Sequence, residues 1–181
     1  MSKATKFSKE EELLLNSFSA DVSAQGSALF LVNSLVTSLA PVYLFYGVHH
    51  LEISDGLFVW AIAVAGATYL LTWAAKNQKH QLKHKLVLKR SQAVEREINK
   101  KYADDKKISR KEKEEHVLYR RNEVADSEAT WLAIFFNNVL FFSLLLILAF
   151  FLFANLNPLI NSFVSIVGAA GIVAFISTSK N

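Results

Sequence analysis

The feature that most constrains this chain is a long run without charge near its C-terminal end. From Trp131 to Ser179 the sequence contains no Asp, Glu, Lys or Arg, and it is rich in Phe, Leu and Ile. A soluble domain cannot bury so long an uncharged segment, whereas about 20 apolar residues in a helix cross the ~30 Å hydrocarbon core of a bilayer. The chain is therefore expected to be a membrane protein, although its 181 residues alone would suit one soluble domain.

Segments of spanning length occur four times. The first two lie at 28–48 and 57–75, and the third runs from Trp131 to Phe153. The fourth begins at Pro158, with Asn157 as its N-cap, because Pro suits the first turn of a helix and Asn accepts from its free amides. We predict an all-α membrane protein with four transmembrane helices.

A highly charged block separates the two apolar pairs. All but four of the 20 Lys and Arg residues lie between Lys76 and Asp126. The part from Lys76 to Lys101 has neither Gly nor Pro and is rich in helix formers, so it is expected to continue the second span for about 39 Å. Residues 102–108 are typical of a turn, and a capping box at 109–112 begins a returning helix. The block is predicted to form a helical hairpin between the second and third spans.

These segments predict a simple domain order. It consists of a cytosolic amphipathic N-terminal segment at 1–27, a first transmembrane pair at 28–75, a cytosolic basic hairpin at 76–128, a second transmembrane pair at 129–177 and a cytosolic tail at 178–181. The orientation follows from the positive-inside rule, since the two short loops contain no Lys or Arg. The apolar residues of the N-terminal segment recur every four positions, which suits a helix on the membrane surface or one packed on the hairpin.

Reactive chemistry is not apparent in the sequence. There is no Cys, and the spans contain no ionisable group other than tyrosine, which counts against a pump or transporter. His80 and His84 share a helix face, but neighbouring lysines would repel a metal ion. We therefore predict no cofactor, no metal and no enzymatic activity. Asn137 and Asn138 face different sides of one helix, so at least one should bond to another helix, either in this chain or in another subunit.

The basic hairpin is the part that predicts a function. Its charge could serve only to set topology, or it could bind phosphates of a nucleic acid, with contacts that weaken steeply in salt. Anionic lipid attracts charges only within about a Debye length of the membrane, so it cannot serve the distal tip of an upright hairpin. A large polyanion docked at the membrane, such as the ribosome, fits better.

Several short motifs, which follow one another along the chain, also resemble those of a known family. They are 11–15 (EELLL), 27–30 (SALF), 82–85 (LKHK) with 89–90 (KR), 109–113 (SRKEK), 122–126 (NEVAD) with 128–130 (EAT), and 137–138 (NN). With these motifs the chain closely resembles the gamma subunits of the translocon-associated protein complex, also called the signal sequence receptor complex. The likeness covers nearly the whole length.

The resemblance implies a non-catalytic, multi-pass subunit of the endoplasmic reticulum membrane with both termini cytosolic. It implies a complex with the alpha, beta and delta subunits beside the Sec61 channel. It also implies that the hairpin contacts the translating ribosome, through rRNA and large-subunit proteins, while secretory chains are translocated. Membrane lipid is the remaining expected partner.

By analogy the ribosome contact is placed at the hairpin tip. The candidate ribosome-binding residues are Arg110, Lys111 and Lys113, with Lys106 and Lys107 in support, and the stem residues Lys83, Lys85, Lys89 and Arg90. The main alternative is a membrane insertase of the Oxa1 type, which also carries a cytosolic coiled coil. Such a protein usually needs a hydrophilic groove in the membrane, and these spans provide no charge for one.

Overall fold

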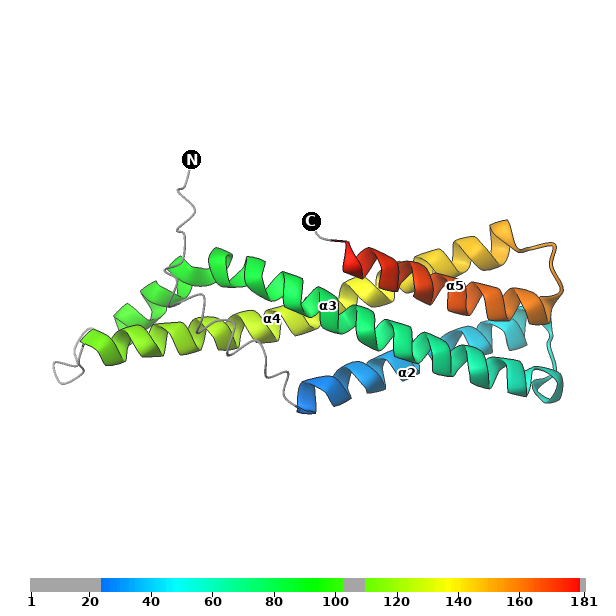
Figure 1. The fold of residues 1–181 in the computed structure, drawn as a ribbon, viewed down its shortest axis with the longest axis horizontal. Coiled ribbons are helices and arrows are strands. Elements are labelled where there is room, and N and C mark those ends of the chain that lie inside the picture. Colours follow the sequence, from blue (N-terminus) through cyan, green and yellow to red (C-terminus); the bar gives the residue numbers. More distant parts are fainter. Residues whose placement is uncertain (1–23, 103–109, 180–181) are drawn as a thin grey trace. The chain divides into compact units, whose positions relative to one another are not determined.

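The computed structural model describes residues 24–102 and 110–179 of the chain. They form α2 (Ala24–His49), α3 (Ile53–Lys101), α4 (Arg110–Ile147), the π-helical turn η1 (Leu148–Leu152) and α5 (Pro158–Thr178), as Figure 1 shows. No strand occurs in these ranges. Four of the helices are long and apolar enough to cross a membrane. The predicted all-α fold with four spanning helices is confirmed.

Three predictions fall outside the described residues. They concern the amphipathic N-terminal segment before residue 24, the tip of the hairpin with its capping box at Ser109, and the last two residues of the tail. The predicted helical continuation of the second span is confirmed, since α3 runs without interruption from Ile53 to Lys101.

The described residues divide into two compact units. The apolar unit comprises residues 24–78 and 133–179, and the charged unit comprises residues 79–102 and 110–132. Helices α3 and α4 contribute to both, and α2 and α5 belong to the apolar unit alone. Each unit has its own packing.

Small residues form the centre of the apolar unit. Ala63 and Ala67 lie one turn apart on α3, and Ala169 and Ala170 lie on α5; all four are fully buried, beside Phe141 of α4. Between helices in lipid there is little hydrophobic driving force, so close approach of small residues supplies the packing energy. Ala169 and Ala170 of the fourth span thus serve close packing.

Polar side chains of the spans bond to one another inside the apolar unit. The amides of Asn33 and Asn138 exchange two hydrogen bonds, of 3.1 and 3.2 Å, and the Thr37 hydroxyl lies 3.2 Å from the same Asn138 oxygen. Ser38 and Thr68 form a further bond of 2.8 Å between α2 and α3. The expectation that one of the two adjacent asparagines bonds to another helix is confirmed for Asn138, with a partner in this chain.

The third span ends in a π-helical turn that the sequence did not predict. The amide of Phe153 donates to the carbonyl of Leu148 at 2.8 Å, five residues back. The Asn161 amide on α5 donates to the Ala149 carbonyl at 3.0 Å, and its own oxygen accepts from Ser165. A backbone carbonyl loosened by the π turn is thus bonded by a buried side chain, as a polar group in lipid requires.

The connection that follows η1 ends at a predicted cap. The Asn157 side chain accepts a hydrogen bond of 2.9 Å from the Leu159 amide, and Pro158 occupies the first turn of α5. This confirms the cap and the proline position predicted from the sequence. The connection between α2 and α3 contains His50, which has a positive φ of 51°. Both connections lie at the same end of the apolar unit, here called the loop end (Figure 1).

Gly56 provides a test of packing at the loop end. A Cβ at this position would lie 2.8 Å from the Trp60 ring, and the Trp60 indole is held by a 3.1 Å bond to Ser162. We expect Gly56→Ala to destabilise the protein by about 1 kcal/mol, because overpacking outweighs the gain in helix propensity. Unfolding in detergent, followed by Trp fluorescence, measures the change.

The matched control is Gly66→Ala in the same helix. A Cβ there meets nothing within 4 Å, so the propensity gain should appear alone, as a stabilisation of up to about 1 kcal/mol. Equal effects of the two substitutions would contradict the packing of Trp60 over Gly56.

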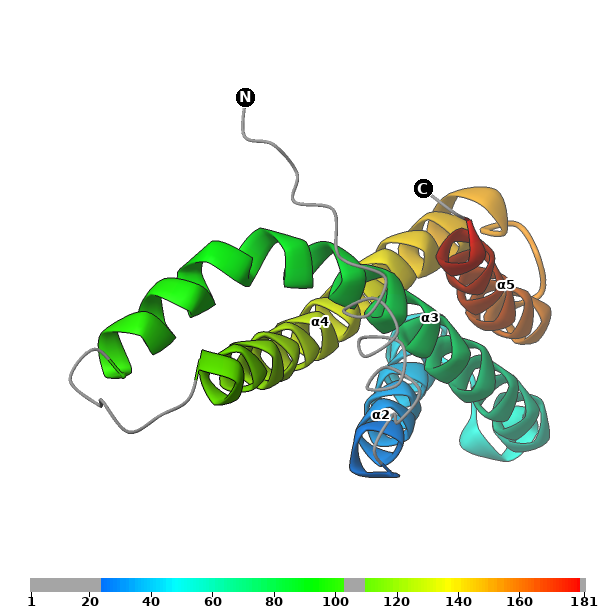
Figure 2. The same ribbon diagram turned by 60° about the vertical axis from the view of Figure 1, so that its left-hand side comes forward.

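The charged unit consists of the polar ends of α3 and α4 (Figure 2). The two helices run in opposite directions, since Lys79 pairs with Asp126 near one end and Arg120 approaches Glu97 near the other. Val87 and Ala125 are buried against each other in this unit. Val94, Ile98 and Ala129 are buried there as well.

Candidate functional site: the basic surface of the charged unit

Two lysines of α3 are buried on one carboxylate of α4. Lys79 Nζ lies 2.9 Å from Asp126 Oδ2, and Lys83 Nζ lies 3.1 Å from Asp126 Oδ1. Their side chains are only 8% and 10% exposed, whereas that of Asp126 is 40% exposed. The spacing of four residues places both amines on one face of α3, so a single carboxylate can accept from both.

This arrangement sets the charge state of Asp126. Burial alone raises the pKa of the carboxyl, but the hydrogen bonds and charges of Lys79 and Lys83 outweigh burial and hold the pKa below its ordinary value of 3.8. Asp126 is therefore an anion at neutral pH. It serves as the counterion that allows two ammonium groups to lie in the interhelical contact.

A second group of ion pairs lies on the surface. Arg90 forms a two-pronged pair with Glu128, at 2.9 and 3.0 Å. Arg120 lies 2.9 Å from Glu123 on its own helix and 4.0 Å from Glu97 on α3, and the Glu123 hydrogen bond raises the pKa of Arg120. Exposed pairs of this kind contribute little individually. They help to align the two helices.

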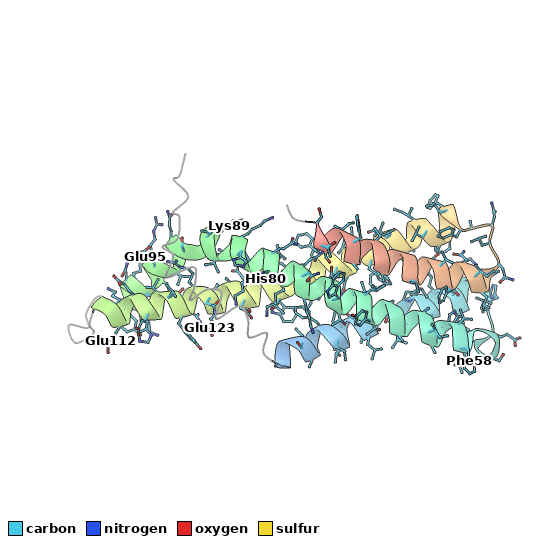
Figure 3. The ribbon with its side chains drawn as sticks, viewed as in Figure 1. Phe58, His80, Lys89, Glu95, Glu112 and Glu123 are labelled. Atoms are coloured by element: carbon cyan, nitrogen blue, oxygen red, sulfur yellow. The ribbon has the colours of Figure 1, made fainter. Side chains whose placement is uncertain are left out.

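The structure therefore separates the predicted stem residues into two kinds. Lys83 and Arg90 are engaged with acidic residues of α4, whereas Lys85 and Lys89 are exposed and form no ion pair with any described residue. Figure 3 shows Lys89 on the outer side of α3. Lys113, near the start of α4, is partly exposed and has no described acidic partner. These three lysines are available to an external anion.

The structure describes the remaining tip residues only in part. Lys106 and Lys107 lie outside the described residues. Arg110 and Lys111 belong to the first turn of α4, and their side chains lie outside the described part. Their assignment to a contact surface remains a prediction.

One feature of this surface was missed by the sequence reasoning. The rings of Tyr102, at the end of α3, and His116, on α4, are stacked with centroids 5.7 Å apart and planes inclined by 25°. Lys101 Nζ lies 5.9 Å from the centre of the Tyr102 ring. The pair joins the far ends of the two helices. Both residues are aromatic in a polar block, and this signal could have suggested a contact, but not which rings would meet.

The histidine pair on α3 has the geometry expected from its spacing. The rings of His80 and His84 lie edge to face, 4.8 Å apart. In the described ranges, no three His, Asp or Glu residues gather as a metal site would require. The two histidines lie beside the Lys79–Asp126–Lys83 cluster in sequence and share its basic surroundings.

These features define a class of protein. It is a multi-pass membrane protein that carries a basic helical pair, with the described lysines divided between buried ion pairs and an exposed surface.

Comparison with known proteins then gives the family. The sequence model of the family described as translocon-associated protein, gamma subunit, matches residues 10–179. A protein named translocon-associated protein subunit gamma, from Dictyostelium discoideum, is 31% identical over 160 residues, which cover 88% of this chain and 91% of that protein. The chain belongs to the translocon-associated protein gamma family. This confirms the resemblance on which the functional expectation was based.

Proposed function

We propose that the protein is a non-catalytic subunit of the translocon-associated protein complex in the endoplasmic reticulum membrane. In this role the basic surface of the charged unit contacts the translating ribosome and so supports co-translational translocation through the Sec61 channel. The partners are the alpha, beta and delta subunits, Sec61, the rRNA and proteins of the large ribosomal subunit, and the surrounding lipid. Both termini and the charged unit lie in the cytosol.

The observation that carries the proposal is the uneven pairing of the basic residues. Acidic residues of α4 neutralise Lys83 and Arg90 at the interhelical contact. These two residues therefore hold α3 and α4 in position and do not bind the ribosome themselves. Lys85 and Lys89 remain exposed without a described acidic partner. Exposed lysines on a paired helix scaffold attract phosphates, because each contact releases counterions from the nucleic acid. Lys113 is partly exposed as well, and we propose that Lys106, Lys107, Arg110 and Lys111, which were predicted from the sequence alone, take part in the same contact.

The insertase alternative has less support. An insertase of the Oxa1 type is expected to have a hydrophilic groove within the membrane. The apolar unit has a groove between α2 and α3, but its walls are apolar and aromatic and carry no charge. The groove therefore does not favour an insertase.

Ribosome co-sedimentation of the full-length protein in detergent, across a salt series, tests the proposal. Five phosphate contacts at the tip would make the logarithm of the binding constant fall with the logarithm of salt concentration with a slope of about −3 to −5. Changing Lys106, Lys107, Arg110, Lys111 and Lys113 to Glu should abolish sedimentation with the ribosome. If wild type and this variant bind alike, the tip is not the contact.

A charge-preserving variant is the matched control. Exchanging Lys for Arg, and Arg for Lys, at the same five positions keeps the charge and should leave the salt slope unchanged. A second variant, Lys85→Glu with Lys89→Glu, measures the contribution of the stem separately. If the wild-type protein does not sediment with ribosomes even at low salt, the proposed contact is wrong and the charge serves topology alone.

A further inference from the structure

An apolar groove opens between α2 and α3 in the half of the apolar unit that is nearer the loop end. Its volume is about 520 Å³, and its walls include Leu39, Tyr43 and Tyr46 of α2 and Trp60, Ala61 and Val64 of α3. This volume lies in the range of small-molecule sites, about 300–1,000 Å³. All of these residues belong to spanning helices, so the groove lies in the membrane.

The groove exists because two wall residues leave space. Trp60 turns inward, where its indole donates to Ser162 at 3.1 Å and the side chain is 4% exposed. Its neighbour Ala61 offers only a methyl group. The space on the outer side of α3 is therefore not filled by the chain itself.

The walls decide what can occupy this space. Water needs two to four polar partners to be held in a cavity, and the lining offers no such set. A transmembrane helix of another protein would dock through small residues or hydrogen bonds between helices. Ala61 is the single small residue among the wall residues named above, and the α2 wall includes two bulky Tyr side chains. Hydrocarbon chains remain as the occupant that needs no polar contact along the groove.

The tyrosines distinguish one end of the groove from the other. Tyr43 is 78% exposed and Tyr46 is 48% exposed, and neither hydroxyl bonds to a described residue. Both lie in the last two turns of α2, which ends at His49. At a helical rise of 1.5 Å they are within about 10 Å of that end, at the depth where Tyr side chains reach the headgroup region.

We propose that this groove binds one glycerophospholipid. One acyl chain lies along Ala61 and Val64, against the Trp60 ring. The ester or phosphate oxygens accept hydrogen bonds from the Tyr43 and Tyr46 hydroxyls near the loop end. The apolar walls and the hydroxyls at one end match the two parts of such a lipid. A chain held in this way exchanges more slowly than the lipids that merely surround the protein.

Quenching of Trp60 by brominated lipid tests the acyl-chain site. The full-length protein with Trp73→Phe and Trp131→Phe, which retains Trp60, is placed in bilayers of phosphatidylcholine with brominated chains. We expect at least two-fold quenching of Trp60, because bromine held in the groove lies close to the Trp60 ring in its wall. Ala61→Phe fills the groove and should remove most of this quenching. Ile62→Phe, a change at a neighbouring 63% exposed position outside the groove, should leave quenching unchanged.

Retention of lipid during purification tests the headgroup contact. Mass spectrometry should find one glycerophospholipid per chain after detergent exchange in wild type and in Ile62→Phe, and a several-fold lower amount in Ala61→Phe. Tyr43→Phe with Tyr46→Phe keeps both rings and removes both hydroxyls, so it should also lose the lipid. If Ala61→Phe does not fold, the double Tyr variant alone tests whether the groove binds the lipid. Equal retention in wild type and the Tyr variant, or recovery of a sterol in place of a phospholipid, would overturn the proposal.

Discussion

Asp126→Asn is expected to loosen the charged unit by about 2 kcal/mol. The substitution keeps the shape of the side chain but removes the negative charge shared by Lys79 and Lys83, whose side chains are 8% and 10% exposed. Breaking a fully buried ion pair costs about 3–5 kcal/mol. The smaller figure applies here because the Asp126 side chain is 40% exposed and is screened by solvent. Hydrogen–deuterium exchange of amides in residues 79–102 and 110–132 measures the loss.

Glu128→Gln is the matched control for this prediction. It also replaces a carboxylate by an amide, two residues further along α4. Glu128 pairs with Arg90, and the Arg90 and Glu128 side chains are 48% and 32% exposed. An exposed pair contributes less than about 1 kcal/mol, so exchange should change little. If both substitutions have the same effect, the burial of Lys79 and Lys83 does not determine the stability of the unit.

The effect of Asp126 should also depend on pH in a defined direction. Its pKa is lowered in the folded protein from an ordinary value of 3.8. The unfolded chain therefore binds the proton more readily, and the ionised carboxylate stabilises the folded state above about pH 3.8. This contribution disappears as the pH falls through the folded pKa. The difference in opening free energy between wild type and Asp126→Asn should shrink toward zero over the same interval.

The parts of the fold that were predicted correctly depend on local rules. Asn157 and Pro158 begin α5 because capping and proline geometry involve only neighbouring residues. Helix α3 continues past the second span because residues 76–101 contain no helix breaker, whatever lies around them. Apolar length alone identified the four spans.

The parts that were not predicted depend on the register between helices. Lys83 and Lys85 are alike in the sequence, yet Lys83 is buried on Asp126, 43 residues away, and Lys85 is exposed. Trp60 lies near the start of the second span, and nothing in the sequence indicates that it donates to Ser162 in the interior. The π turn involves Ala149, whose carbonyl is bonded by Asn161 of another helix. Periodicity within one helix contains no information on such partners.

The two adjacent asparagines of α4 are expected to respond to the same substitution in opposite directions. Asn138→Leu removes the partner of the Asn33 amide and of the Thr37 hydroxyl, and should destabilise the apolar unit by about 2 kcal/mol. Asn137 is 2% exposed, and neither atom of its amide forms a hydrogen bond with a described residue. Asn137→Leu is nearly isosteric and should stabilise the unit by about 1 kcal/mol, because it removes an unsatisfied buried amide. Unfolding by denaturing detergent in mixed micelles measures both changes.

The double variant Asn33→Leu with Asn138→Leu separates the amide pair from simple loss of volume. Replacing both partners leaves no unpaired amide of the pair, so the double variant should be more stable than Asn138→Leu alone. The coupling energy between the two positions should be about 1–2 kcal/mol, at the upper end of values for hydrogen bonds between helices in membranes. Additive effects would contradict the pairing of Asn33 with Asn138. A marked loss of stability in Asn137→Leu would instead show that its amide has a partner, such as a buried water molecule, on which the packing of α4 depends.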